Sequence, residues 1–186
     1  MLSELTEAMI VNGVVLTTVL ATDAGPARKI GAARLIRPAI AAAVIIPLFV
    51  DRPVTHGTGL MVEIAGAVAG VLGGLAALGL MRVYRSPKTG RPVSRAGWPY
   101  ALFWTEVIGA RAAFSYGAAH WFEPQIVAWA VANQVSLAAI TDGLIFMAVA
   151  MILVRTAGLR VRAAGLPAAA TAGPAAAHRS PAPQNA

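Results

Sequence analysis

Four charged side chains lie inside long apolar stretches of this chain, where burying a charge is costly. They are Glu63, Glu106, Arg111 and Asp142. In a lipid environment such a residue costs roughly 2.5–3.5 kcal/mol near a helix centre on insertion scales. Carboxylates and a guanidinium at different depths could relay protons or bind a polar solute. Alternatively, two opposite charges could neutralise each other and lock two helices together.

Position along the predicted helices indicates which of these charges could meet. Arg111 lies thirteen residues beyond Trp98, and Asp142 lies thirteen residues before Arg155 on the next apolar stretch. At a helical rise of ~1.5 Å per residue, both are about 20 Å from the same edge. The sequence therefore predicts an intramembrane polar pair between Arg111 and Asp142.

A longer polar path through the bundle is the functional interpretation of the same residues. Glu106 lies five residues before Arg111 on the same helix, about one and a half turns nearer the inner edge. Glu63 lies near the outer end of its stretch, at the level of Asn133 and Gln134. The path and the structural lock both remain open from the sequence.

Other chemistry finds little support in the sequence. The chain has no cysteine, which excludes disulfides, thiol relays and cysteine-ligated metal within it. We expect no catalytic residue, metal or cofactor, because no nucleophile–base set or zinc signature is present. A haem or metal bridged by the lone residues His56 and His120 is a weaker alternative. The segment 86–92 lacks the order of a phosphate loop, and we expect an exposed basic turn there.

Five apolar stretches must position these residues. Only 12% of the residues are charged, against about 25% in soluble domains, which favours lipid as the main solvent. A membrane-spanning helix needs ~20 residues. The expected fold is therefore an all-α transmembrane bundle of five spans, at about Ala8–Ala21, Leu35–Val50, Leu60–Met81, Pro99–Trp121 and Ile126–Val154.

The connectors between the stretches alternate in charge. Twelve of the fifteen basic residues fall in three segments, at 28–37, 82–95 and 155–162, whereas Glu4 and Glu7 precede the first stretch. Basic loops stay in the cytoplasm. We therefore expect a multi-pass cell-membrane protein with its N-terminus outside and its C-terminus inside. The basic residues are then topology determinants that also contact anionic lipid, so no nucleic-acid partner is expected.

Two further patterns refine this picture. Trp98 and Tyr100 at the predicted inner edge, with Trp121 and Trp129 at the outer edge, form an expected aromatic belt. The five-helix domain should cover residues 1–162. Residues 163–186 are rich in alanine and proline, with almost nothing to bury, and we expect a disordered cytoplasmic tail.

Small residues at four-residue spacing predict helix packing. Such residues let two backbones approach closely in lipid, where the hydrophobic effect provides little drive for association. One interpretation is that the third and fourth spans pack against each other. The other is a homodimer across the third span. The residues are Gly66, Gly70 and Gly74 in the third span, and Gly109, Ala113 and Gly117 in the fourth.

Residues 28–156 resemble the CcdC-like membrane proteins, which are named for lying beside cytochrome c biogenesis genes. The resemblance is carried by Arg37-Pro38, Pro47, the glycine-rich span, Glu106-Val-Ile-Gly-Ala-Arg111, and Asp142-Gly-Leu-Ile-Phe-Met before Arg155. It implies a membrane architecture and no defined reaction.

We therefore expect an accessory or assembly component that acts through helix packing and a basic cytoplasmic face. Its partners would be the lipid bilayer and either a larger membrane complex or a second copy. The alternative is a small proton- or ion-coupled transporter that uses the polar path. A membrane enzyme ranks third, because no reactive constellation is visible.

Overall fold

The chain forms five described helices and a small sheet. The computed structural model describes residues 4–23, 25, 27–31, 36, 39–40, 42–44, 46–47 and 56–167. The helices are α1 (Glu4–Asp23), α3 (Gly57–Gly79), α4 (Trp98–His120), α5 (Glu123–Ala132) and α6 (Leu137–Ala164). The strands are β1 (Arg28–Lys29), β2 (Met81–Arg85) and β3 (Pro92–Ala96). Much of the predicted span 35–50, including Arg37 and Pro38, lies outside the described residues, as does most of the predicted tail.

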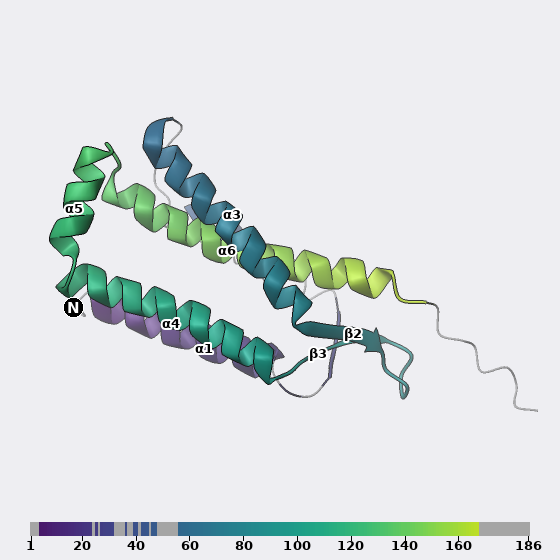
Figure 1. Ribbon diagram of the computed structural model, residues 1–186. Coiled ribbons are helices and arrows are strands. Elements are labelled where there is room, and N and C mark those ends of the chain that lie inside the picture. Colours follow the sequence, from purple (N-terminus) through teal and green to yellow (C-terminus); the bar gives the residue numbers. More distant parts are fainter. Residues whose placement is uncertain are drawn as a thin grey trace, which may run out of the picture.

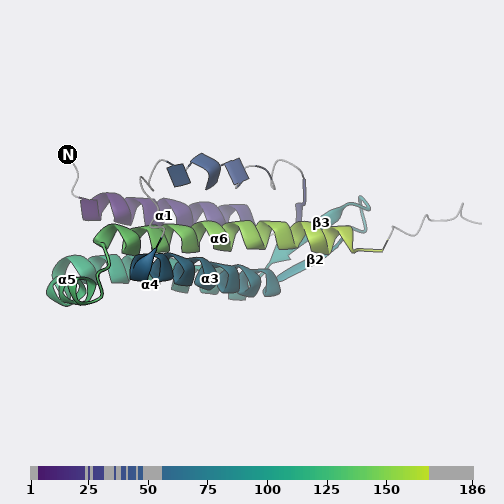
Figure 2. The same cartoon turned by 90° about the horizontal axis from the view of Figure 1, so that it is seen from above.

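The four long helices form two packed pairs. Helix α3 crosses α6 along most of its length, and α1 lies beside α4 (Figure 1). Seen from above, all four run lengthwise through an elongated bundle (Figure 2). Helix α5 connects the two pairs at one end, and the sheet lies at the other. We call these the far end and the sheet end.

The sheet end collects the helix termini that we expected on the cytoplasmic side. Helices α1, α3 and α6 end there, and α4 begins there. The apolar core lies near the same end. Its buried residues come from all four long helices and from the sheet: Val19, Ala77, Leu78, Met81, Ala96, Tyr100, Trp104, Ile108, Met151 and Leu159.

The prediction of a mainly helical protein is confirmed, with two helices suited to a membrane. Within the described residues, α3 and α6 are long and apolar enough to cross a bilayer. Helix α4 begins and ends within one residue of its predicted bounds. A shorter apolar helical segment, Asn12–Ala21, lies within α1.

The predicted continuous span from Ile126 to Val154 is wrong, because the chain turns between α5 and α6. Asn133 donates its side-chain amide to the carbonyl of Trp129 at 2.8 Å, which ends α5. Gln134 then adopts a left-handed backbone, with a φ of 53°. Ser136 begins α6 by accepting the amide of Ala139 at 3.1 Å. These polar residues satisfy free helix-terminal groups, so a break is favoured inside an apolar run.

The expected exposed basic turn at 86–92 is present, but it joins two strands that the all-α prediction missed. Residues 81–96 form a β-hairpin, and β1 pairs with its second strand, so the strand order is β1-β3-β2. Apolar and polar residues alternate along β2, which gives a strand one buried face. Gly90 closes the turn with a φ of 62° and donates to the carbonyl of Ser86 at 2.8 Å.

Candidate functional site

A buried ion pair joins the two helix pairs at the sheet end. Asp23, the last residue of α1, pairs with Arg155 of α6. Tyr100 of α4 donates its hydroxyl to Asp23 Oδ2 at 2.8 Å. Arg155 Nη1 donates to both Asp23 Oδ2 and Tyr100 Oη, the latter at 2.7 Å. The side chains of Arg155 and Asp23 are only 10% and 2% exposed.

An aromatic wall surrounds this cluster. The guanidinium of Arg155 lies 6.0 Å from the ring centre of Trp104, within the range of a cation–π contact. The rings of Tyr100 and Trp104 are 6.2 Å apart and tilted. Trp104 Nε1, Arg155 Nε and Thr156 Oγ1 are buried without a hydrogen-bond partner in the part of the chain described here. The cluster thus combines a satisfied carboxylate with several uncompensated donors, a costly arrangement to bury.

The sequence predictions placed these residues elsewhere. Arg155 was expected beyond the last span, yet it lies inside α6 and is buried. Tyr100 was expected in an interfacial belt, yet its side chain is fully buried. Asp23 was not considered. Because the three positions are far apart in the sequence, only the packing of α1, α4 and α6 brings them together. A lone acidic residue between an apolar stretch and a basic connector was the one available signal.

Three arginines at the sheet end donate to carbonyls at helix ends. Arg28 donates to Ala21 in the last turn of α1 at 2.7 Å. Arg162 donates to Leu78 in the last turn of α3 at 2.8 Å. Arg85 bonds the carbonyls of Leu166 and Pro167, just beyond α6. Such groups have no partner within the helix, and a cation there also offsets the helix dipole.

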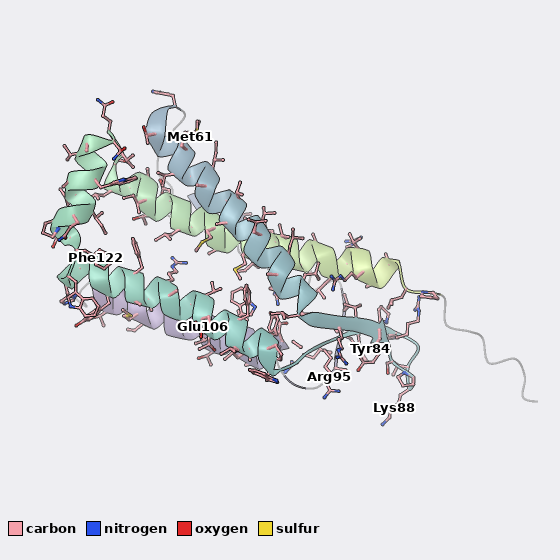
Figure 3. The ribbon with its side chains drawn as sticks, in the orientation of Figure 1. Met61, Tyr84, Lys88, Arg95, Glu106 and Phe122 are labelled. Atoms are coloured by element: carbon pink, nitrogen blue, oxygen red, sulfur yellow. The ribbon has the colours of Figure 1, made fainter. Side chains whose placement is uncertain are left out.

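The remaining basic residues of the sheet are exposed. Arg82 and Arg95 lie directly opposite each other in the antiparallel register of β2 and β3. Lys88 lies at the tip of the hairpin, while Tyr84 and Arg95 lie along the strands (Figure 3). The sheet end is therefore strongly basic, with the buried ion pair just behind it.

The predicted polar residues divide between the two helix pairs. Glu63 of α3 and Asp142 of α6 are both buried. Each lies within one turn of the point where Gly66 meets Gly143. Glu106 is exposed and Arg111 half-buried on α4, which packs mainly against α1 (Figure 3). An Arg111–Asp142 pair would join helices from different pairs, and it stays a prediction.

Asn133 and Gln134 have a structural role in this chain. Both are exposed in the turn between α5 and α6, and the side chain of Asn133 bonds within its own helix end. They therefore lie at the far end of the bundle, where they end a helix.

The glycines of α3 pack against α6. The prediction that they pack against the fourth span is therefore wrong. A Cβ built on Gly66 would lie 2.2 Å from the carbonyl oxygen of Gly143. One built on Gly70 would lie 2.2 Å from that of Met147, and one on Gly74 2.7 Å from that of Met151. This face is covered within the chain, so the alternative interpretation, a homodimer across it, would require α6 to leave.

The small residues of α4 do not form a helix–helix contact. A Cβ on Gly109 would meet nothing within 4 Å, and Ala113 is exposed. Gly117 instead gives room to Phe122 in the turn before α5, which a Cβ would approach at 2.1 Å. Spacing alone identified small residues in both helices, but none of the described helices packs closely against Gly109, and Ala113 is exposed.

Metal chemistry gains no support from the described residues, where no three His, Asp or Glu side chains come together as ligands. No family model, curated protein or solved structure matches this chain. The resemblance to the CcdC-like proteins therefore stays a prediction. The arrangement itself can hold helices in register and present positive charge at one end.

Proposed function

We propose that this chain is a multi-pass membrane protein of five spans, with its sheet end in the cytoplasm, that acts as an accessory or assembly component. The outer apolar face of α3 carries this proposal. Met61 is 67% exposed and Leu72 is 62% exposed, with Ile64, Val68 and Leu75 also exposed. An apolar surface of this kind along a whole helix indicates contact with lipid or with other membrane helices.

The spacing of exposed tryptophans supports a bilayer around the bundle. Trp98 at the start of α4 is 74% exposed and Trp121 just after its end is 72% exposed. Twenty-three helical rises separate them, which is about 34 Å. The hydrocarbon core of a bilayer is ~30 Å thick, and tryptophan prefers its two edges.

Chain connectivity supports a further span. Lys29 in β1 lies at the sheet end, whereas Gly57 begins α3 at the far end. The sequence predicts a span between these two points, at about Leu35–Val50. Together with α1, α3, α4 and α6, it would make five. The basic residues at the sheet end favour the cytoplasm for that side.

The absence of cysteine allows a direct test of this topology. Single variants Lys88→Cys and Gln134→Cys would be treated with a membrane-impermeant maleimide in intact cells and in inverted vesicles. We expect Gln134→Cys to react in cells, and Lys88→Cys to react only in inverted vesicles. Leu72→Cys is the matched control, because its side chain is exposed in the chain but would face lipid.

Reaction of Leu72→Cys in both preparations would contradict membrane burial of α3. Reaction of Lys88→Cys in intact cells would reverse the proposed orientation. The accessory role has its own measurement, which is purification in a mild detergent. We expect other membrane proteins to co-purify in defined proportion. A chain that purifies alone and carries flux in liposomes would contradict that role.

A proton-coupled transporter is the second candidate, favoured by the burial of two carboxylates where α3 crosses α6. Glu63 and Asp142 are 5% and 6% exposed. Buried acidic residues inside a membrane bundle are typical of proton pathways. This candidate predicts that proton flux into liposomes containing the pure protein is lost in Asp142→Asn and in Glu63→Gln. Flux that is absent from the unaltered protein would exclude it.

A further inference from the structure

Two arginines face each other across the hairpin without an internal partner. Arg82 of β2 and Arg95 of β3 are directly opposite in the antiparallel register, and both are exposed. Opposite residues share one face of a sheet, with Cα atoms about 4.5–5.5 Å apart. Neither guanidinium forms a hydrogen bond or an ion pair with any residue of the described chain. Like charges in this position repel, and an anion between them would remove that cost.

The same face of the sheet also carries a lysine and a tyrosine. Tyr84 lies two residues after Arg82 and therefore on the same side of β2. Lys29 of β1 is level with Val93, which is in turn level with Tyr84. We call Arg82, Arg95, Tyr84 and Lys29 the outer face of the sheet. Figure 3 shows Tyr84 and Arg95 on neighbouring strands, with Lys88 further out at the tip.

The opposite face of the sheet is already occupied. Met81 and Ala96 are buried in the core, and Ser94 is 2% exposed. Arg85, also on that side, is engaged with the chain that follows α6. On the outer face the four named side chains are exposed, while Val93 between them is 4% exposed, so among the described residues most of the exposed positions of the sheet's strands lie on this side.

The height of the two arginines fits the headgroup layer of a bilayer. Arg82 follows the last residue of α3 by three positions, and Arg95 precedes the first residue of α4 by three. At ~3.3 Å per strand residue, both lie about 10 Å beyond the helix ends. Exposed Trp98 marks that boundary, and an arginine side chain can reach back toward it.

We propose that the outer face of the sheet binds the phosphate group of an anionic phospholipid between Arg82 and Arg95. The inference rests on the membrane topology proposed above and names the ligand of the basic end. Arginine binds phosphate oxygens through two parallel hydrogen bonds, so two opposed arginines supply four donors to one group. Lys29 adds charge, and Tyr84 adds a ring that suits the polar–apolar boundary. Because the pair lies at headgroup height, lipid is a better source of phosphate than solution.

The test compares two double variants that remove the same charge. The chain in a nonionic detergent would be titrated with phosphatidylglycerol, with phosphatidylcholine and with inorganic phosphate, and the rise in melting temperature would give each affinity. We expect Arg82→Gln/Arg95→Gln to weaken phosphatidylglycerol binding about twenty-five-fold, from roughly a factor of five per arginine near a membrane surface. We expect Lys88→Gln/Arg91→Gln, at the hairpin tip, to weaken it less than three-fold.

Equal weakening in the two double variants would overturn the proposal in favour of diffuse attraction. Protection by inorganic phosphate that matches phosphatidylglycerol would overturn the lipid source. Absence of any protection specific to phosphatidylglycerol would overturn the site altogether. Arg82→Lys/Arg95→Lys keeps the charge and should also bind more weakly than the unaltered chain, even if the Gln variant fails to fold. Failure here leaves the cysteine-labelling result intact, so the two proposals can fail separately.

Discussion

The two junctions between helices in this bundle are built in opposite ways. Helices α3 and α6 meet through bare backbone, with Gly66, Gly70 and Gly74 lying against carbonyls of α6. The α1/α4 pair meets α6 at the sheet end, where an apolar core surrounds the buried ion pair Asp23–Arg155 and the hydroxyl of Tyr100. The first junction depends on close backbone contact repeated over several turns. The second includes a few buried polar atoms at one end, so it should respond more sharply to single substitutions of those residues.

The largest effect should come from breaking the ion pair on one side only. Arg155→Met leaves the carboxylate of Asp23 buried without its cation, which costs about 3–5 kcal/mol. The measurement is unfolding in a denaturing detergent titration. The double variant Asp23→Asn/Arg155→Met carries no buried charge at this position, and we expect it to be more stable than Arg155→Met alone. A double variant less stable than the single one would show that the pair is not the main source of coupling.

Adding a methyl group where α3 meets α6 should cause a smaller loss of stability. Gly70→Ala places a Cβ against the carbonyl of Met147, and overpacking of this kind costs about 1–3 kcal/mol. Gly109→Ala is the matched control on α4, where a Cβ meets nothing within 4 Å. There alanine should be neutral or stabilising by up to ~1 kcal/mol from helix propensity. Equal stability of the two variants in the same detergent titration would mean that α3 and α6 are not in close contact.

The smallest loss of stability should come from removing the hydroxyl of Tyr100 while its ring is kept. Tyr100→Phe removes the hydrogen bond to Asp23 but keeps the ring beside Trp104, so we expect a loss of about 1.5 kcal/mol. Because the cluster is buried, the loss should not change between low and high salt. A loss that disappears at high salt would place the cluster at the surface.

The sequence predicted best those features that depend on a single helix. The bounds of α4 and the close-packing glycines of α3 follow from local patterns of apolar and small residues. The helix that packs against those glycines could not be predicted in the same way. The spacing of small residues shows that another helix can approach closely, but it does not show which helix does so. Gly109 and Gly66 have similar surroundings in sequence, yet only Gly66 meets another backbone.

Two of the wrong predictions concern segments that carry local signals in the sequence. Asn133, Gln134 and Ser136 interrupt the apolar run that we expected to be one span, and each has a known role at helix ends. The alternation along 81–85 likewise indicates a strand. The Asp23–Arg155 pair is different, because 132 positions separate its members and no local pattern connects them. Contacts of that kind depend on tertiary packing.

One arginine at the sheet end also connects a helix to the strand that follows it. Arg162 Nη1 donates to the carbonyl of Leu78, in the last turn of α3, at 2.8 Å and to that of Met81, at the start of β2, at 3.4 Å. A single cationic nitrogen of α6 therefore covers both sides of the point where α3 gives way to β2. Removing that donor in Arg162→Met should leave both carbonyls without this partner and loosen the transition from helix to hairpin.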